Sequence, residues 1–230
     1  MIRPILIASL LGSVLFGKEV GKEVGKEVTP DKRLQHAVNA LAEMVQTNDN
    51  GIPRTLIGKA QCIVIVPGLI KGAFLFGGKY GRGFASCRKR GGGWTAPAAV
   101  AIEGGSFGSQ LGASSTDLIM LVMNKKGMSH ILADKFTLGS QYAVVQGMTG
   151  REASVNTDVL ARSAILTYSH AKGLFAGISL EGATLRTDSG ENKRLYGREM
   201  RNKEILETKI ATPVAARSLV TALNRLAPRT

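Results

Sequence analysis

The sequence has few cysteines, histidines and aromatic residues, and each shortage excludes a class of protein. Two cysteines, Cys62 and Cys87, are too few for a disulfide framework and lack metal-site spacing, so they form either one bridge or two buried thiols. The three histidines, His36, His130 and His170, are scattered along the chain, and no phosphate-binding P-loop is present. We therefore expect neither a metal nor a cofactor.

Aromatic and acidic residues are also scarce. Aromatic residues make up 5% of the chain and do not interleave with basic residues, so the pattern of a single-strand nucleic-acid binder is missing and we expect no nucleic acid partner. Asp and Glu number 17 against 30 Lys and Arg, which gives a formal net charge of +13. Such a basic surface attracts polyanions, and anionic lipid headgroups are the better candidate.

The N-terminal residues resemble an export signal. Arg3 precedes an apolar run from Ile5 to Phe16, which is too short to span a bilayer comfortably. We interpret residues 1–17 as a signal peptide or an N-terminal anchor, although no A-x-A-like cleavage site follows. The protein is then secreted or periplasmic in a bacterium, and peripheral to a membrane. Residues 18–28 belong to a three-fold GKEV repeat, which we interpret as a linker.

The folded domain is expected over residues 29–230, with helices at both of its ends. Thr29-Pro30-Asp31 has the features of a helix start, and a shorter helix is expected after Ile52-Pro53. Thr212-Pro213 is expected to begin a C-terminal helix that lies on a sheet. The apolar positions that carry these predictions are Leu34, Val38, Leu41 and Val45 in the first helix, Leu56, Ile57 and Ala60 in the second, and Ala216, Leu219, Val220, Leu223 and Leu226 in the third.

Between these helices the chain has the character of a sheet. With 28 glycines, short apolar runs alternate with glycine clusters, which is typical of antiparallel strands joined by tight turns. Cys62 to Val66 predicts a buried strand, and Leu118 to Met123 predicts a central strand covered on both faces. Asn124 to Gly127 is expected to be a turn, and Ile165 to Leu185 a hairpin.

The predicted fold class is α+β. We expect a strongly twisted antiparallel sheet flanked by the N- and C-terminal helices, with closure into a barrel as an open alternative.

One short motif suggests an enzyme. Gly104 to Gly108 matches G-x-S-x-G, so a serine hydrolase that uses Ser106 is an alternative function. That chemistry needs a strand, a strained turn and a helix, whereas the following sequence is strand-like and broken by glycines. Glu103 and Glu181 could act as acid and base, but in strands such carboxylates commonly pair with a nearby cation. We expect no enzyme.

Basic residues near predicted turns and helices are the candidate ligands for lipid phosphate, since Lys and Arg bind phosphate as point charges and bidentate forks. The alternative for each is a solvated surface charge. The candidates are Lys32, Arg33, Arg54, Lys59, Arg82, Arg88, Lys89, Arg90, His170 and Lys172.

Three long segments resemble the SYLF domain, a lipid-binding module. They read VPGLIKGAFLFGGKYGRG, GGWTAPAAVAIEGGSFGSQLGAS and ILTYSHAKGLFAGISLEGATLRTDSGENKRLYG, and they occur in the family's order. The likeness extends from about Leu34 to Leu226. SYLF domains occur alone behind signal peptides in many bacterial proteins, and beside Src-homology-3 or FYVE domains in eukaryotes.

The resemblance implies a non-enzymatic domain that binds phosphoinositides or other anionic phospholipids, partly through a basic N-terminal segment that maps to Lys32 and Arg33. Some eukaryotic members also bind actin through this region. The apparent export signal makes actin a poor candidate here. A structural cell-envelope protein whose basic face meets a glycan or another protein is a further alternative, and the oligomeric state stays open.

Overall fold

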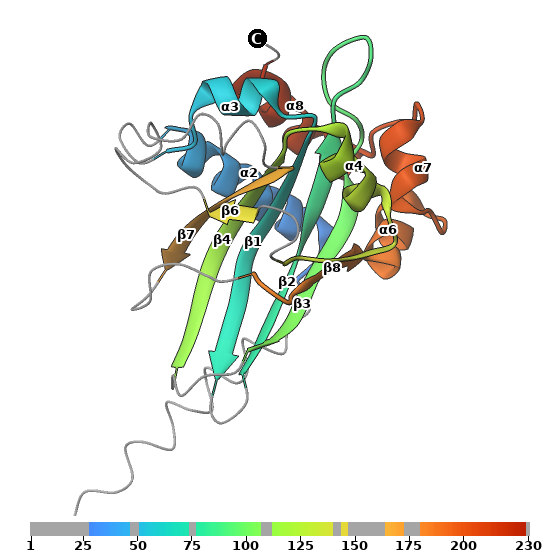
Figure 1. The fold of residues 1–230 in the computed structure, drawn as a ribbon. Helices are drawn as coiled ribbons and strands as arrows, with labels where there is room; N and C mark the ends of the chain where they lie inside the picture. Colours follow the sequence, from blue (N-terminus) through green and yellow to red (C-terminus); the bar gives the residue numbers. More distant parts are fainter. Residues whose placement is uncertain are drawn as a thin grey trace, which may run out of the picture.

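The structure, a computed structural model, is an eight-stranded sheet with helices on both faces (Figure 1). It describes residues 28–46, 51–73, 77–106, 112–139, 144–146, 164–172 and 180–228. The proposed signal segment and nearly all of the GKEV repeat lie outside these residues. None of the described helices is long and apolar enough to cross a bilayer.

The strands form one sheet in the order β5-β8-β3-β2-β1-β4-β7-β6. All neighbours are antiparallel except β6 and β7, which are parallel. The sheet curls without closing between the described strands, because β5 and β6 lie at its two edges (Figure 1). The strand bounds are β1 (Cys62–Ala73), β2 (Gly77–Cys87), β3 (Ala98–Ser106), β4 (Gly112–Val122), β5 (Lys135–Thr137), β6 (Val144–Gln146), β7 (Ile165–Lys172) and β8 (Thr184–Thr187).

The helices lie in two groups that cover opposite faces of the sheet. One face carries α2, α3 and α8, and α2 contacts α8, so the predicted association of the N- and C-terminal helices with the sheet is confirmed. The other face carries α4 and α7. The helix bounds are α2 (Pro30–Gln46), α3 (Arg54–Lys59), α4 (Lys125–Leu132), α6 (Ser189–Tyr196), α7 (Asn202–Glu207), a 3-10 turn η2 (Val214–Ala216) and α8 (Arg217–Leu226).

Alternation of side chains along the central strands builds a core on each face. In β1, Val64 and Val66 join the cluster under α4 and α7, whereas Ile63 and Ile65 join the cluster under α2 and α8. In β4, the strand predicted from Leu118 onward, side chains also alternate between the two clusters, and Leu118 to Val122 are fully buried. The prediction that both faces of this strand are covered is confirmed. The α+β fold class is likewise confirmed.

The two cysteines form a disulfide across neighbouring strands. Cys62 on β1 and Cys87 on β2 are register partners with their Cα atoms 3.9 Å apart, and both are fully buried. Of the two alternatives left open by the sequence, the structure contains the bridge.

Several local expectations were wrong. Asn124 to Gly127 is the start of α4 and not a turn, because the Asn124 side chain accepts a hydrogen bond from the Gly127 amide at 2.9 Å and caps the helix. Glu181 lies in a turn and not in a strand. Pro213 precedes the 3-10 turn, so α8 begins only at Arg217.

The expected hairpin from Ile165 to Leu185 is only partly described. Its first run forms β7, which lies between β4 and β6. Residues 173–179, which include most of its second run, lie outside the described residues. Where the chain is described again, β8 pairs with β3 and β5, on the other side of the sheet.

Candidate functional site

Arg88 joins three separate segments at one end of the molecule. It follows β2, and its Nε donates to the carbonyl of Ala60 at 3.3 Å. Its Nη2 donates to the carbonyls of Ile57 and Pro228, at 3.2 Å each. The guanidinium carbon lies 4.1 Å from the centroid of the Trp94 ring. Arg88 therefore ties the end of α3 and the residues after α8 to the β2–β3 connection.

Trp94 reinforces this junction from inside. Its side chain is 1% exposed, and its indole nitrogen donates to the carbonyl of Ala227 at 3.0 Å. The turn between Arg88 and Trp94 is closed by backbone hydrogen bonds between Lys89 and Gly93 and between Gly92 and Lys89. Arg88 and Trp94 also form an antiparallel bridge, so these residues are the tip of the β2–β3 connection. The end of α3, the residues after α8 and the β2–β3 connection are thus held together. Figure 1 shows α3 and α8 at this end of the molecule.

Five exposed cations lie on this junction, and none of them makes an ion pair with another described residue. We call this set the basic end. Its members are Arg54 and Lys59 on α3, Lys89 and Arg90 in the β2–β3 turn, and Arg225 on α8.

The segments that build the basic end contain no acidic residue. From Gly51 to Ile102 there is no Asp or Glu but there are eight Lys or Arg residues, and from Thr208 to Thr230 there is again no acid against four bases. A cluster of one charge sign without compensation raises the local positive potential. Arg225 was not among the sequence candidates, and this lack of acids is the sequence signal that could have indicated it.

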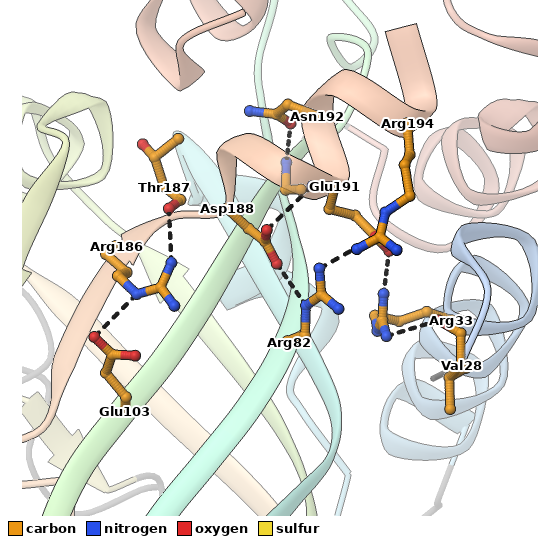
Figure 2. A network of polar contacts seen from close by, with 11 residues as sticks. Val28, Arg33, Arg82, Glu103, Arg186, Thr187, Asp188, Glu191, Asn192 and Arg194 are labelled. Atoms are coloured by element: carbon orange, nitrogen blue, oxygen red, sulfur yellow. Dashed lines mark hydrogen bonds and ion pairs between the residues drawn. The ribbon is translucent and has the colours of Figure 1, made fainter. Parts of the chain in front are cut away.

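Arg33 and Arg82 lie elsewhere, in a polar network at the start of α6 (Figure 2). Arg33 on α2 donates to the carboxylate of Glu191 and, at 2.9 Å, to the carbonyl of Val28. Arg82 on β2 donates to Asp188 at 2.5 Å and to Glu191 at 3.3 Å. Burial alone would lower the pKa of Arg82, but the hydrogen bond and the negative charge of Asp188 raise it overall.

Glu191 is the centre of this network. Its side chain is 1% exposed and has ion pairs with Arg33, Arg82 and Arg194, the last at 3.3 Å. The Asp188 side chain also accepts a hydrogen bond from the Glu191 amide and caps α6. The guanidinium groups of Arg33 and Arg82 are thus held within the protein, and their role as lipid ligands stays a prediction.

The remaining candidates lie apart from both groups. Lys32 is exposed on α2, next to Arg33. His170 on β7 has its Nδ1 atom 3.7 Å from a carboxylate oxygen of Glu43 on α2, and both side chains are about half exposed. Lys172 is the last residue of β7, and its side chain is not among the described parts of the structure. Four of the ten sequence candidates, Arg54, Lys59, Lys89 and Arg90, lie in the basic end. A fifth, Arg88, makes the hydrogen bonds that hold its segments together.

The hydrolase alternative does not fit the architecture around Ser106. Ser106 ends β3, whose neighbours β2 and β8 are both antiparallel to it, and the next described element is the strand β4 and not a helix. Glu103 pairs with Arg186 at 2.9 Å, so the expected cation partner of this carboxylate is confirmed (Figure 2). Among the described residues, no three His, Cys, Asp or Glu side chains gather to hold a metal ion.

Comparison with known proteins identifies the family. The model of the Ysc84 family, described as Las17-binding protein actin regulator, matches residues 103–226. Protein YSC84 of Saccharomyces cerevisiae is 32% identical over 196 residues, or 82% of this chain and 42% of that protein. The SH3 domain-containing YSC84-like protein 1 of Xenopus laevis is 33% identical over 178 residues, or 76% of this chain and 53% of that protein.

A third relative, an SH3 domain-containing protein of Schizosaccharomyces pombe, is 35% identical over 177 residues, or 75% of this chain and 41% of that protein. The chain belongs to the Ysc84 family, which is the SYLF domain family, and the resemblance seen in the sequence is confirmed. It spans about half the length or less of these three relatives.

Proposed function

We propose that this domain binds anionic phospholipid surfaces, with phosphoinositide-like headgroups as the ligand chemistry, through the basic end. The observation that supports this most is the convergence of five exposed cations from α3, the β2–β3 turn and α8 on a junction fixed by Arg88. The segments around them carry no acid that would repel a phosphate. Flexible chain ends would not hold these charges together, whereas this junction does.

A membrane suits this surface better than nucleic acid does. Proteins that bind single strands stack bases on exposed aromatic rings. The aromatic ring at the basic end, Trp94, is 1% exposed and already covered by Arg88. The basic end therefore offers charge without a stacking platform, which favours a headgroup layer.

The charge predicts reversible binding and not permanent anchoring. Each Lys or Arg near an anionic bilayer contributes about 1 kcal/mol, so five contribute about 5 kcal/mol, which corresponds to a dissociation constant of about 0.2 mM. We propose that a second contribution, from the N-terminal residues or from several copies on one surface, raises the affinity.

We further propose that the protein acts outside the cytoplasm, as a secreted or periplasmic protein at a membrane surface. The apolar run after Arg3 supports export, and so does the buried disulfide between Cys62 and Cys87, since disulfides persist in oxidising compartments. We therefore do not propose actin regulation, which the family description names, as a function of this chain. Co-sedimentation of the protein with filamentous actin would contradict the proposal that it acts outside the cytoplasm without actin.

The proposed role is binding without catalysis. The antiparallel surroundings of Ser106 support this over ester hydrolysis. A structural partner in the cell envelope is the remaining alternative, and pull-down from envelope extracts with and without lipid separates it from direct lipid binding.

Sedimentation with vesicles tests the proposal. The wild-type protein is expected to bind vesicles that contain an anionic phospholipid, to ignore vesicles of phosphatidylcholine alone, and to lose binding as salt is raised, because exposed charges are screened. Equal binding to both vesicle types, or binding unaffected by salt, would contradict it.

A further inference from the structure

Two exposed apolar side chains lie side by side on the sheet. Ile70 on β1 and Tyr80 on β2 are direct register partners, and their exposed fractions are 46% and 48%. Register partners place their side chains on the same face of a sheet. Ile70 follows Leu69, which belongs to the core cluster under α4 and α7, so the pair points to the face that carries α2. Adjacent exposed apolar side chains of this size mark a candidate contact surface.

The next row of the same strands is made of glycine. Gly72 and Gly78 lie two positions from Ile70 and Tyr80, and Gly105 on β3 is the register partner of Gly78. A Cβ atom at any of these three glycines would meet no atom of the described residues within 4 Å. At this end of the sheet, β1 and β4 extend past the helices (Figure 1). We call Ile70, Tyr80 and the three glycines the apolar patch, which offers a flat surface to small side chains.

The apolar patch consists of uncharged residues. Its register neighbours are Ser115 on β4 and Glu103 on β3, and Glu103 pairs with Arg186 at 2.9 Å. An anionic bilayer is attracted by unpaired cations, and the described side chains of this surface supply none. A second copy of the chain carries the same net charge of +13, and like charges repel. Charge therefore favours an occupant that is neutral.

The described chain begins beside the apolar patch. The Val28 carbonyl accepts a hydrogen bond from Arg33 at 2.9 Å, and Arg33 pairs with Glu191. Glu191 also pairs with Arg82, which lies two positions after Tyr80 on the same face of β2, about 7 Å along the strand (Figure 2). Val28 is itself 38% exposed. The residues that precede Val28 therefore start next to the patch.

Those residues are the GKEV repeat, and its composition suits the patch. The repeat, residues 17–28, contains three Lys and three Glu, so its net charge is zero. Its valines, Val20, Val24 and Val28, lie four positions apart and therefore share one side of the chain in a helix or in a strand. Four extended residues span about 13 Å, so Val24 reaches about 13 Å and Val20 about 26 Å from Val28. These lengths allow both valines to lie on the patch.

We propose that the GKEV repeat packs on the apolar patch, with Val20 and Val24 against Ile70, Tyr80 and the open glycines. Valine is a β-branched side chain that packs well on the pleated surface of a sheet. The repeat is then a strap that covers this end of the sheet, and not only a spacer. The contact depends neither on lipid binding at the basic end nor on the removal of residues 1–16.

Limited proteolysis of the purified full chain with trypsin tests this contact. Trypsin cleaves after lysine, and cleavage of a docked segment follows the population of its released form, so Ile70→Ser is expected to speed cleavage within the repeat at least about fivefold. Ile210→Ser, the same change at a half-buried side chain on the opposite face, is the control and should leave the rate unchanged. Ile70 is exposed, so its variant should stay folded, which thermal unfolding checks. Equal cleavage rates in the wild-type protein and Ile70→Ser would overturn the proposal.

Methyl NMR identifies what lies on the patch. In protein labelled at isoleucine and valine methyl groups, the Cδ1 methyl of Ile70 is expected to show nuclear Overhauser effects to Val20 or Val24. The double variant Val20→Ser/Val24→Ser should remove them and shift the Ile70 signal, whereas the Ile210 signal stays in place. An Ile70 signal that moves only with protein concentration assigns the patch to a second copy, and one that moves only with added anionic vesicles assigns it to a bilayer. Either result, or an Ile70 methyl without contacts to the repeat, would overturn the proposal.

Discussion

Arg33 and Glu191, which lie 158 positions apart, form a buried ion pair that joins α2 to the start of α6. The exposed fractions of the two side chains are 9% and 1%. Glu191 also binds Arg82 of β2, so one carboxylate connects the N-terminal helix, the sheet and the helix that follows β8. The two arginines therefore have an evident structural role.

Replacement of Glu191 should destabilise the protein strongly. Glu191→Ala leaves the buried Arg33 guanidinium without its carboxylate, which typically costs about 3–5 kcal/mol. Urea denaturation measures the change in the free energy of unfolding. Glu207→Ala, at an exposed position on α7, is the matched control and should change stability little. Equal effects of the two substitutions would show that the network around Glu191 does not stabilise the fold.

Gly83 is required where β1 shifts register against β2. A Cβ atom at Gly83 would lie against the carbonyl oxygen of Ile65 and 2.7 Å from the Cα of Val66, both backbone atoms. Gly83→Ala should therefore cost about 1–3 kcal/mol or more by overpacking. Gly78→Ala on the same strand meets nothing within 4 Å and should be nearly neutral. Thermal unfolding of both variants checks the prediction, and a neutral Gly83→Ala would refute this close approach of the strands.

Tyr168 and Tyr196 should ionise late. Burial raises the pKa of Tyr168 from 10.0 to about 12 and also raises that of Tyr196, whose hydroxyl donates to the Pro97 carbonyl at 2.6 Å. A raised pKa means that the folded state keeps its proton longer than the unfolded state. Each such phenol therefore contributes to the free energy of unfolding. For Tyr168 this contribution is complete below pH 10.0 and is lost as the pH rises through about 12.

Tyrosine absorbance at 295 nm measures this titration. The signal near pH 11 should fall short of that of the urea-unfolded chain, and Tyr168→Phe should remove part of the late phase. Coincident titration of folded and unfolded protein would contradict the burial of these phenols.

The sequence predicted elements whose pattern is local. The helical spacing of Leu34 and Leu41, and the apolar run from Leu118, are read from neighbouring residues, and both elements were found where they were expected. The start of α4 was missed because an Asn followed by two lysines and a glycine also suits a turn, and only the cap at Asn124 distinguishes the two.

The candidate site was predictable only in part, since charge and position in a turn do not reveal partners. Arg82 and Lys89 look alike as basic residues near glycines. Arg82 binds Asp188, 106 positions away, whereas Lys89 is exposed. The strand register and the docking of α6 decide this difference, and both depend on contacts between distant parts of the chain. The absence of acids over residues 51–102 is the sequence signal that most clearly marks the basic end.

The most direct test of the account compares two charge reversals of equal size by vesicle sedimentation. One variant replaces Arg54, Lys59, Lys89 and Arg90 of the basic end by Glu. The other replaces four exposed lysines elsewhere, which are Lys125, Lys135, Lys193 and Lys203. Their surroundings contain acids such as Asp134 and Glu204.

Both variants change the net charge equally, so only the position of the charge differs. The account predicts that the basic-end variant binds anionic vesicles about 100-fold more weakly or worse, while the other variant loses less than about fivefold, because distant exposed charges are screened. Equal losses in the two variants, or full binding by the basic-end variant, would contradict it.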